Sequence, residues 1–231
     1  MKKINLAFIF LGIFLCISIF GNESNQKKEI KPDAYEFYAA EMQDFLEREG
    51  NVKEKDYNSL CMLGLFHLGE AIRKKDAENT GYEKDISKSI EYFSKAVNKD
   101  KDLTSAYKGL FSVYYFIGNA QKALNNIQQA IAKDKNDFEA VFMLGNFYYE
   151  EGNLPEAARS YMFVTILFED EMVPELMIKA ARIWIELGER GNAESVIEEF
   201  RGRFPNHPLR AQAEALLGTS DSEESKPQGE A

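Results

Sequence analysis

The chain contains few of the residues from which metal and nucleophilic sites are built. Its 231 residues include two histidines and two cysteines. His67 and His207 each stand without a second histidine or cysteine nearby, so a zinc site is not expected. Neither a phosphate-binding glycine loop nor a zinc-protease motif occurs, and no pair among the 38 acidic residues is distinguished as an acid and base. We therefore expect no metal, no cofactor and no enzyme activity.

Basic residues are outnumbered. The chain has 28 lysines and arginines against 38 aspartates and glutamates, which gives a formal net charge of −10 at pH 7. Such an acidic surface argues against nucleic acid and anionic lipid surfaces as the main partners. Proteins, peptides and small molecules remain as partner classes.

Long apolar runs are absent except at the N-terminus. Lys2 and Lys3 precede an almost unbroken apolar run over residues 4–20, and the chain turns polar at Asn22. This order is typical of an export signal or a membrane anchor within residues 1–21. Such a run would rise roughly 26 Å as a helix, slightly short of a ~30 Å hydrocarbon core, so cleavage is favoured over anchoring. Both alternatives place the rest of the chain outside the cytoplasm, in the periplasm or cell envelope.

The two cysteines bear on the same compartment. Phe14 and Leu15 precede Cys16 in a run loosely similar to a bacterial lipobox, which would allow membrane attachment through a lipid on Cys16. Because lipoproteins usually place a small residue where Leu15 stands, we favour Cys16 as one more apolar residue of the signal. Cys61 is the other cysteine. No intrachain disulfide can then form in the exported part, and stability must come from packing.

One pattern of residue types recurs along the middle of the chain. The clearest copy has Tyr107, Leu110, Tyr114, Gly118, Ala123, Ile127 and Ala130, and the same offsets 34 residues later hold Val141, Leu144, Tyr148, Gly152, Ala157, Tyr161 and Val164. A further copy, shifted by 36 residues, has Met177, Ala180, Trp184, Gly188, Ala193, Ile197 and Phe200. An earlier copy is split between Leu63 and Gly64 on one side and Ser89, Phe93 and Ala96 on the other, with about thirteen extra residues between its halves. We expect these extra residues to form a long hairpin loop or to extend the first helix.

A helix-turn-helix period of this length resembles the tetratricopeptide repeat, and the split first copy also resembles the Sel1-like repeat. The resemblance implies an all-α fold, a right-handed α-solenoid of about four helix pairs over residues 57–207. Each pair is too small to bury its own apolar stripe, so neighbouring pairs must stack. We expect an amphipathic capping helix at 32–50 and another at 208–218, a solvated linker at 22–31 and a disordered acidic tail at 219–231.

Particular residues sharpen this expectation. Gly145 lies inside a helical pattern, where glycine costs about 1 kcal/mol relative to alanine, so a close packing contact should compensate. Gly152 should cap that helix, and Pro155 then falls in the first turn of the next. Trp184 should be buried. His67 takes the position that Tyr114, Tyr148 and Trp184 occupy in the other copies, so it should fill the core, whereas His207 should lie at a helix start.

In tetratricopeptide proteins the first helix of each repeat lines a concave groove. Carried over position by position, that lining would consist of Cys61, Leu65, Lys108, Ser112, Tyr115, Phe116, Phe142, Asn146, Tyr149, Ile178, Arg182 and Ile185. We refer to these residues as the recognition face. Ser112 stands where members that clamp a terminal carboxylate carry an asparagine, so that activity is not carried over.

The resemblance implies a non-catalytic scaffold or adaptor of the bacterial envelope that binds a protein or peptide partner. Two alternatives stay open. An enclosed groove with converging polar groups would suit a small-ligand or lipid binder or an enzyme subunit, and an apolar outer face would suit a structural assembly subunit. The aromatic residues of the recognition face could also pack mainly against one another or under the predicted helix at 32–50.

Overall fold

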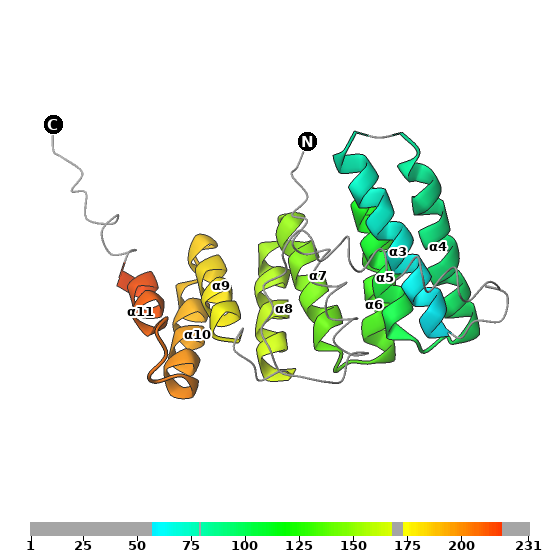
Figure 1. Cartoon of the computed structure of the whole chain (residues 1–231). Coiled ribbons are helices and arrows are strands. Elements are labelled where there is room, and N and C mark those ends of the chain that lie inside the picture. The colour runs from blue at the N-terminus through cyan, green and yellow to red at the C-terminus, as the bar shows by residue number, and fades with distance from the viewer. Residues whose placement is uncertain (1–56, 79, 168–172, 219–231) are drawn as a thin grey trace. The chain divides into compact units, whose positions relative to one another are not determined.

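The computed structural model describes residues 57–78, 80–167 and 173–218, and these residues form nine α-helices and no strands (Figure 1). The predicted all-α arrangement of helix pairs is confirmed. The expected export segment, linker, first capping helix and acidic tail lie outside the described residues. Within the described ranges, no helix is both long enough and apolar enough to cross a membrane. The chain divides into two compact units, residues 1–134 and 135–231, which are treated separately below.

The described part of the first unit consists of two helix pairs. They are α3 (Tyr57–Asp76) with α4 (Tyr82–Lys99), and α5 (Thr104–Phe116) with α6 (Ala120–Lys133). The helices of each pair pack along one another, and α4 also packs on α5. The core between them holds Leu60, Leu68, Phe93 and Val113, all of them buried. This burial of apolar side chains between successive pairs is the stacking that the repeat pattern predicts.

The first pair is longer than the others because both of its helices are extended. Helices α3 and α4 have 20 and 18 residues, against 13 and 14 in α5 and α6. The extra residues of the first copy were expected in a long loop or a longer first helix. The extended first helix is confirmed, and α4 is lengthened as well.

The second unit contains the remaining five described helices. They are α7 (Phe138–Glu150), α8 (Leu154–Leu167), α9 (Val173–Glu186), α10 (Arg190–Arg203) and α11 (Arg210–Gly218). Helix α8 packs on both α7 and α9, α10 packs on α9, and α11 contacts α9 and α10. Ala213 is the buried residue of α11. Trp184 is only 8% exposed, so its predicted burial is confirmed.

The turn between α7 and α8 confirms the predicted roles of its glycine and proline. Gly152 has a φ of 79°, the left-handed conformation that glycine adopts without strain. The amide of Asn153 donates to the carbonyl of Tyr148 at 2.8 Å, which satisfies one of the last carbonyls of α7. Pro155 then lies in the first turn of α8. The chain therefore reverses in a few residues, and this places α8 against α7.

Candidate functional site

The recognition face falls on both units, and its accessibility differs from residue to residue. In the first unit Leu65, Ser112 and Tyr115 are half-buried, whereas Cys61, Lys108 and Phe116 are buried. In the second unit Phe142, Asn146 and Ile185 are half-buried, Ile178 is buried, and Tyr149 and Arg182 are exposed. A buried side chain offers a partner little contact area, so the accessible chemistry of this face lies mainly on α7 and α9.

The aromatic residues of the first unit are held by their neighbours. The ring of Tyr115 stacks on that of Phe111, with 5.7 Å between centroids. The ammonium of Lys75, at the end of α3, lies 4.5 Å from the ring centroid of Phe116. Ser112 donates to the carbonyl of Lys108 at 3.1 Å, within its own helix. These contacts fix the side chains and bring no set of polar groups together.

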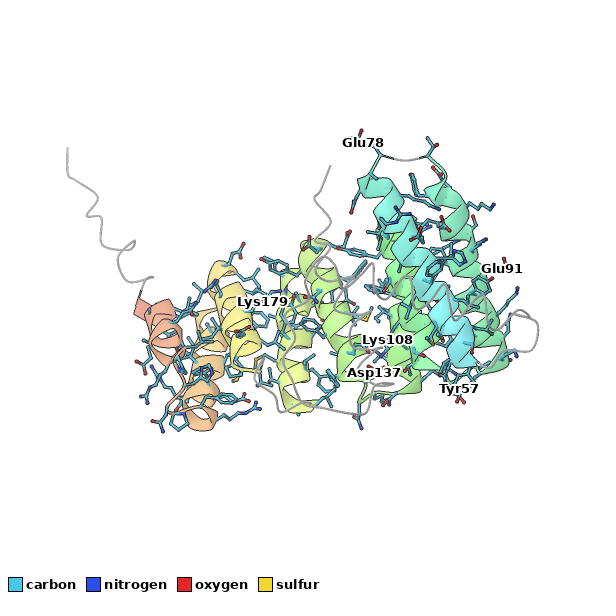
Figure 2. The ribbon with its side chains drawn as sticks, viewed as in Figure 1. Tyr57, Glu78, Glu91, Lys108, Asp137 and Lys179 are labelled. Atoms are coloured by element: carbon cyan, nitrogen blue, oxygen red, sulfur yellow. The ribbon has the colours of Figure 1, made fainter. Side chains whose placement is uncertain are left out.

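The second unit gathers polar groups around Tyr161, a residue that the recognition face does not include. Its ring is fully buried on α8. Its hydroxyl donates to Oδ1 of Asn146 on α7 at 2.8 Å and accepts from Nζ of Lys179 on α9 at 2.8 Å. One phenol oxygen therefore joins three consecutive helices. Figure 2 shows Lys179 on the side of α9 that faces α8.

Space for the Tyr161 ring comes from Gly145. A Cβ atom at this position would lie 3.0 Å from the Tyr161 ring and 3.0 Å from Cβ of Ser160, which is tighter than ordinary van der Waals contact. The close approach predicted for Gly145 is confirmed. Because the glycine admits the ring, the hydroxyl of Tyr161 can reach the side chain of Asn146 on the same helix, α7.

The ammonium of Lys179 lies against two aromatic rings. Nζ is 4.4 Å from the ring centroid of Tyr161 and 4.6 Å from that of Tyr149, distances at which a cation is attracted to the π face. Burial lowers the pKa of Lys179, and the negative charge of Glu150 offsets part of that effect. Burial also raises the pKa of Tyr161, helped by Tyr149 and Glu150, so its hydroxyl keeps its proton. We call Asn146, Tyr149, Tyr161 and Lys179 the Tyr161 cluster.

A second cluster of ionisable groups, the His67 cluster, lies between α3 and α4 and consists of His67, Lys74, Asp85 and Tyr92. His67 is buried as predicted, and its Nδ1 donates to Oδ1 of Asp85 at 2.9 Å. Oδ2 of Asp85 accepts from Lys74, and the ring of Tyr92 stacks on His67 with 5.6 Å between centroids. Burial lowers the pKa of His67, and the bond to Asp85 offsets it only in part. Burial pushes the pKa of Asp85 upward, but the hydrogen bonds from Lys74 and His67 outweigh it and lower that pKa.

The His67 cluster is not arranged as an accessible reaction centre. His67 and Asp85 are each only 7% exposed. In the described part of the chain, no three histidine, cysteine, aspartate or glutamate side chains converge as metal ligands. His207 lies before α11, where its Nδ1 accepts from the amide of Leu209 at 3.2 Å, in agreement with a position at a helix start.

Comparison with known proteins gives structural relatives only. No protein-family model and no curated protein matches the chain. Among solved structures, a crystal structure of MamA is similar with a TM-score of 0.52 and 16% identity, over 89% of this chain and 94% of that chain. A second MamA structure gives 0.50 and 18%, over 81% and 91%. TTC0263, a thermophilic tetratricopeptide-repeat protein of Thermus thermophilus, gives 0.51 and 15%, over 92% and 98%.

These likenesses extend over most of both chains, but their identities are low, so they bear on the fold alone. The chain has the tetratricopeptide-repeat fold, as the repeated residue pattern predicts.

Proposed function

We propose that this protein is a non-catalytic scaffold of the bacterial envelope that binds a protein or peptide partner on its recognition face. Tetratricopeptide pairs expose one face of each first helix along a stack, and such stacks provide extended binding surfaces. The acidic composition and the accessible groups on α7 and α9 support a protein partner over nucleic acid or a lipid surface.

The observation that carries this proposal is the exposure of Tyr149 beside the ammonium of Lys179. Its side chain is 40% exposed although one ring face lies against the ammonium of Lys179. Arg182, one turn further along α9, is exposed and makes no ion pair within the described residues. Tyrosine and arginine are enriched among the residues that dominate binding energy. A tyrosine held in place by a cation also loses little entropy when a partner covers it.

The ionisable groups elsewhere favour a scaffold over an enzyme. His67, Asp85 and Lys74 have the perturbed environments that often mark catalytic sites. Their hydrogen bonds are directed at one another, and His67 and Asp85 are buried between α3 and α4. This geometry is that of a structural ion network, which holds an extended helix pair together.

Export is part of the proposal and rests on Lys2, Lys3 and the apolar run after them. A fusion of residues 1–30 to a reporter that is active only outside the cytoplasm should give signal. A silent reporter that is well expressed would contradict export. Mass analysis of the native chain would then distinguish a cleaved signal, an uncleaved anchor and a lipid on Cys16.

Binding is tested by separating contact from stability. We expect Phe142→Ala and Tyr149→Ala to reduce strongly the proteins recovered with the chain after crosslinking in the envelope, while thermal unfolding changes little. Phe163→Ala is the matched control, because Phe163 is also an exposed aromatic residue, 42% exposed, but lies on α8, the second helix of its repeat, and not on the recognition face. If both recognition-face variants unfold early and the molecules that remain folded capture partners normally, the recognition face is core and the proposal is wrong.

A further inference from the structure

Among the four copies of the repeat pattern, one has a hydroxyl at the position of Tyr161. The positions that correspond to Tyr161 in the neighbouring repeats are Ile127 and Ile197, which have no polar atom in their side chains. The positions that correspond to Gly145 there are Phe111 and Ala181. The third repeat, formed by α7 and α8, therefore has a larger and polar residue, Tyr161, on α8 and a smaller one, Gly145, on α7. The ring of Tyr161 occupies the space that a side chain at Gly145 would need. This paired change brings a hydroxyl of the second helix, α8, to Asn146 of the recognition face.

The chemistry of Lys179 fixes the direction of the hydrogen bonds. An ammonium group is a donor and has no acceptor, so the oxygen of Tyr161 must accept from it. The phenol then has a single proton to give, and the group that receives it is the side-chain amide of Asn146. That amide must present its oxygen inward. The positive charge of Lys179 also polarises the phenol, which strengthens its donation.

The fixed amide leaves its nitrogen for a partner. With Oδ1 of Asn146 bound to Tyr161, the two N–H groups of Nδ2 have no protein acceptor among the described residues, and the side chain is half-exposed. A flexible asparagine can turn either its donor or its acceptor toward a ligand. Asn146 cannot do so without breaking the bond to Tyr161, so at this point the surface offers donors alone.

We propose that Tyr161 is a positioning residue that locks Asn146 with its N–H groups outward, so that the third repeat recognises an oxygen acceptor in a bound protein segment. This inference rests on the proposed function and adds the chemistry that the partner must present there. The acceptor is a main-chain carbonyl or a carboxylate. A partner group with only N–H donors would leave both sides unsatisfied and would be rejected.

The test uses the full chain and peptides selected on it from a random 12-residue phage-displayed library. Each selected peptide is labelled with fluorescein, and its dissociation constant is measured by fluorescence anisotropy. We expect Tyr161→Phe and Asn146→Ala each to weaken binding by roughly five- to tenfold, the range of one lost hydrogen bond. The double variant should bind no worse than Asn146→Ala, because Tyr161 acts through that residue. Tyr148→Phe is the control, since no hydrogen bond of its hydroxyl occurs among the described residues.

Lys179→Met provides a second variant that keeps the Tyr161 hydroxyl. Without the ammonium, the phenol oxygen can accept from Asn146, the amide can turn, and binding should weaken as it does in Tyr161→Phe. Circular dichroism at the assay temperature checks that each variant is folded. Versions of each peptide with Asp and Glu changed to Asn and Gln separate the two acceptors: loss of binding assigns a carboxylate, and retained binding assigns a main-chain carbonyl.

The outcomes separate this inference from the function on which it rests. If Phe142→Ala and Tyr149→Ala abolish peptide binding while folded Tyr161→Phe and Lys179→Met bind as the parent chain does, recognition at this face stands and the positioning role of Tyr161 is overturned. If no selected peptide depends on Phe142 or Tyr149, the proposed function and this inference both fail.

Discussion

Phe93 in the first unit and Tyr161 in the second occupy the same position of their repeats, and they differ by one oxygen atom. Both are aromatic, both are buried, and both face a glycine of the preceding helix, Gly64 or Gly145. A Cβ atom at Gly64 would lie 2.8 Å from the Phe93 ring, and a Cβ atom at Gly145 would lie 3.0 Å from the Tyr161 ring. In both sites, therefore, a glycine on the first helix of the repeat makes room for an aromatic ring on the second helix.

The surroundings of the two rings explain why one is core and the other is joined to the surface. Phe93 also presses on Gly109 of the next helix, where a Cβ atom would lie 2.1 Å from the ring. The corresponding position beside Tyr161 is Lys179, and the counterpart of Asn146 in the first repeat is Leu65. In the first unit each polar partner is thus replaced by glycine or leucine. A repeat can gain a binding feature when its packing stays the same and its polar partners are added together.

The largest expected effect is a loss of stability when the side chain of Phe93 is removed. Phe93→Ala removes a ring that is almost completely buried, so the free energy of unfolding should fall by about 3–5 kcal/mol. Chemical denaturation followed by circular dichroism measures it. Phe163→Ala, at an exposed aromatic, should cost far less. Equal losses in the two variants would mean that Phe93 is not the centre of the first unit's core.

A sharper test of the comparison adds a hydroxyl to Phe93 and removes the hydroxyl from Tyr161. Phe93→Tyr places a hydroxyl between two glycines, with leucine where Tyr161 finds asparagine, so stability should fall by about 1–3 kcal/mol for the unpaired buried group. Tyr161→Phe should cost less, because its hydrogen bonds lie toward the accessible face and water can replace them. Urea unfolding of both variants measures the difference. If Phe93→Tyr is as stable as the parent chain, the first site has room and partners that the described contacts do not show.

Repeat offsets predicted the helix pairs, the turn at Gly152, the contact at Gly145 and the burial of Trp184. Each of these features depends on which face of its helix a residue occupies, and residues one 34-residue period apart occupy equivalent faces. The same offsets placed Tyr161 at the repeat position of Ile127 and Ile197 and did not select Lys179. That position is buried in all three repeats, but a repeat period does not tell how far a side chain reaches. It cannot tell that a phenol hydroxyl and an ammonium group span three helices.

The His67 cluster was missed for a different reason. His67 has counterparts in every repeat, so its burial was predictable from Tyr114, Tyr148 and Trp184. Asp85 belongs to the lengthened part of α4, and its counterpart 34 residues later is Asn119, which precedes α6, so the offsets gave no sign of a buried acidic residue there. A buried histidine requires a hydrogen-bond partner, and this general requirement was the one available signal that an acidic residue would lie nearby.

The first unit also differs from the second in having a buried histidine, and this predicts the smallest effect. Because the pKa of folded His67 lies below the ordinary 6.5, the unfolded chain binds a proton that the folded chain resists. Stability should therefore decline as the pH falls below about 6.5, until folded His67 is protonated as well. The decline is limited because Asp85 is ionised and attracts the imidazolium, while Lys74 and Lys88 oppose it. The Asp85 carboxylate itself contributes until the pH falls below its own lowered pKa.

The pH dependence is tested by urea unfolding of the parent chain and of His67→Gln at about pH 7.5, 6.5 and 5.5, values that bracket the ordinary histidine pKa. Glutamine keeps a hydrogen-bond donor for Asp85 and does not titrate. The parent chain should lose more stability than the variant between the highest and the lowest pH. His207 and all other titrating groups are common to both chains, so the difference between the two pH profiles belongs to His67 and the groups coupled to it. Parallel profiles would show that His67 has the same proton affinity in the folded and unfolded chain, and the His67 cluster would then stabilise the first unit independently of pH in this range.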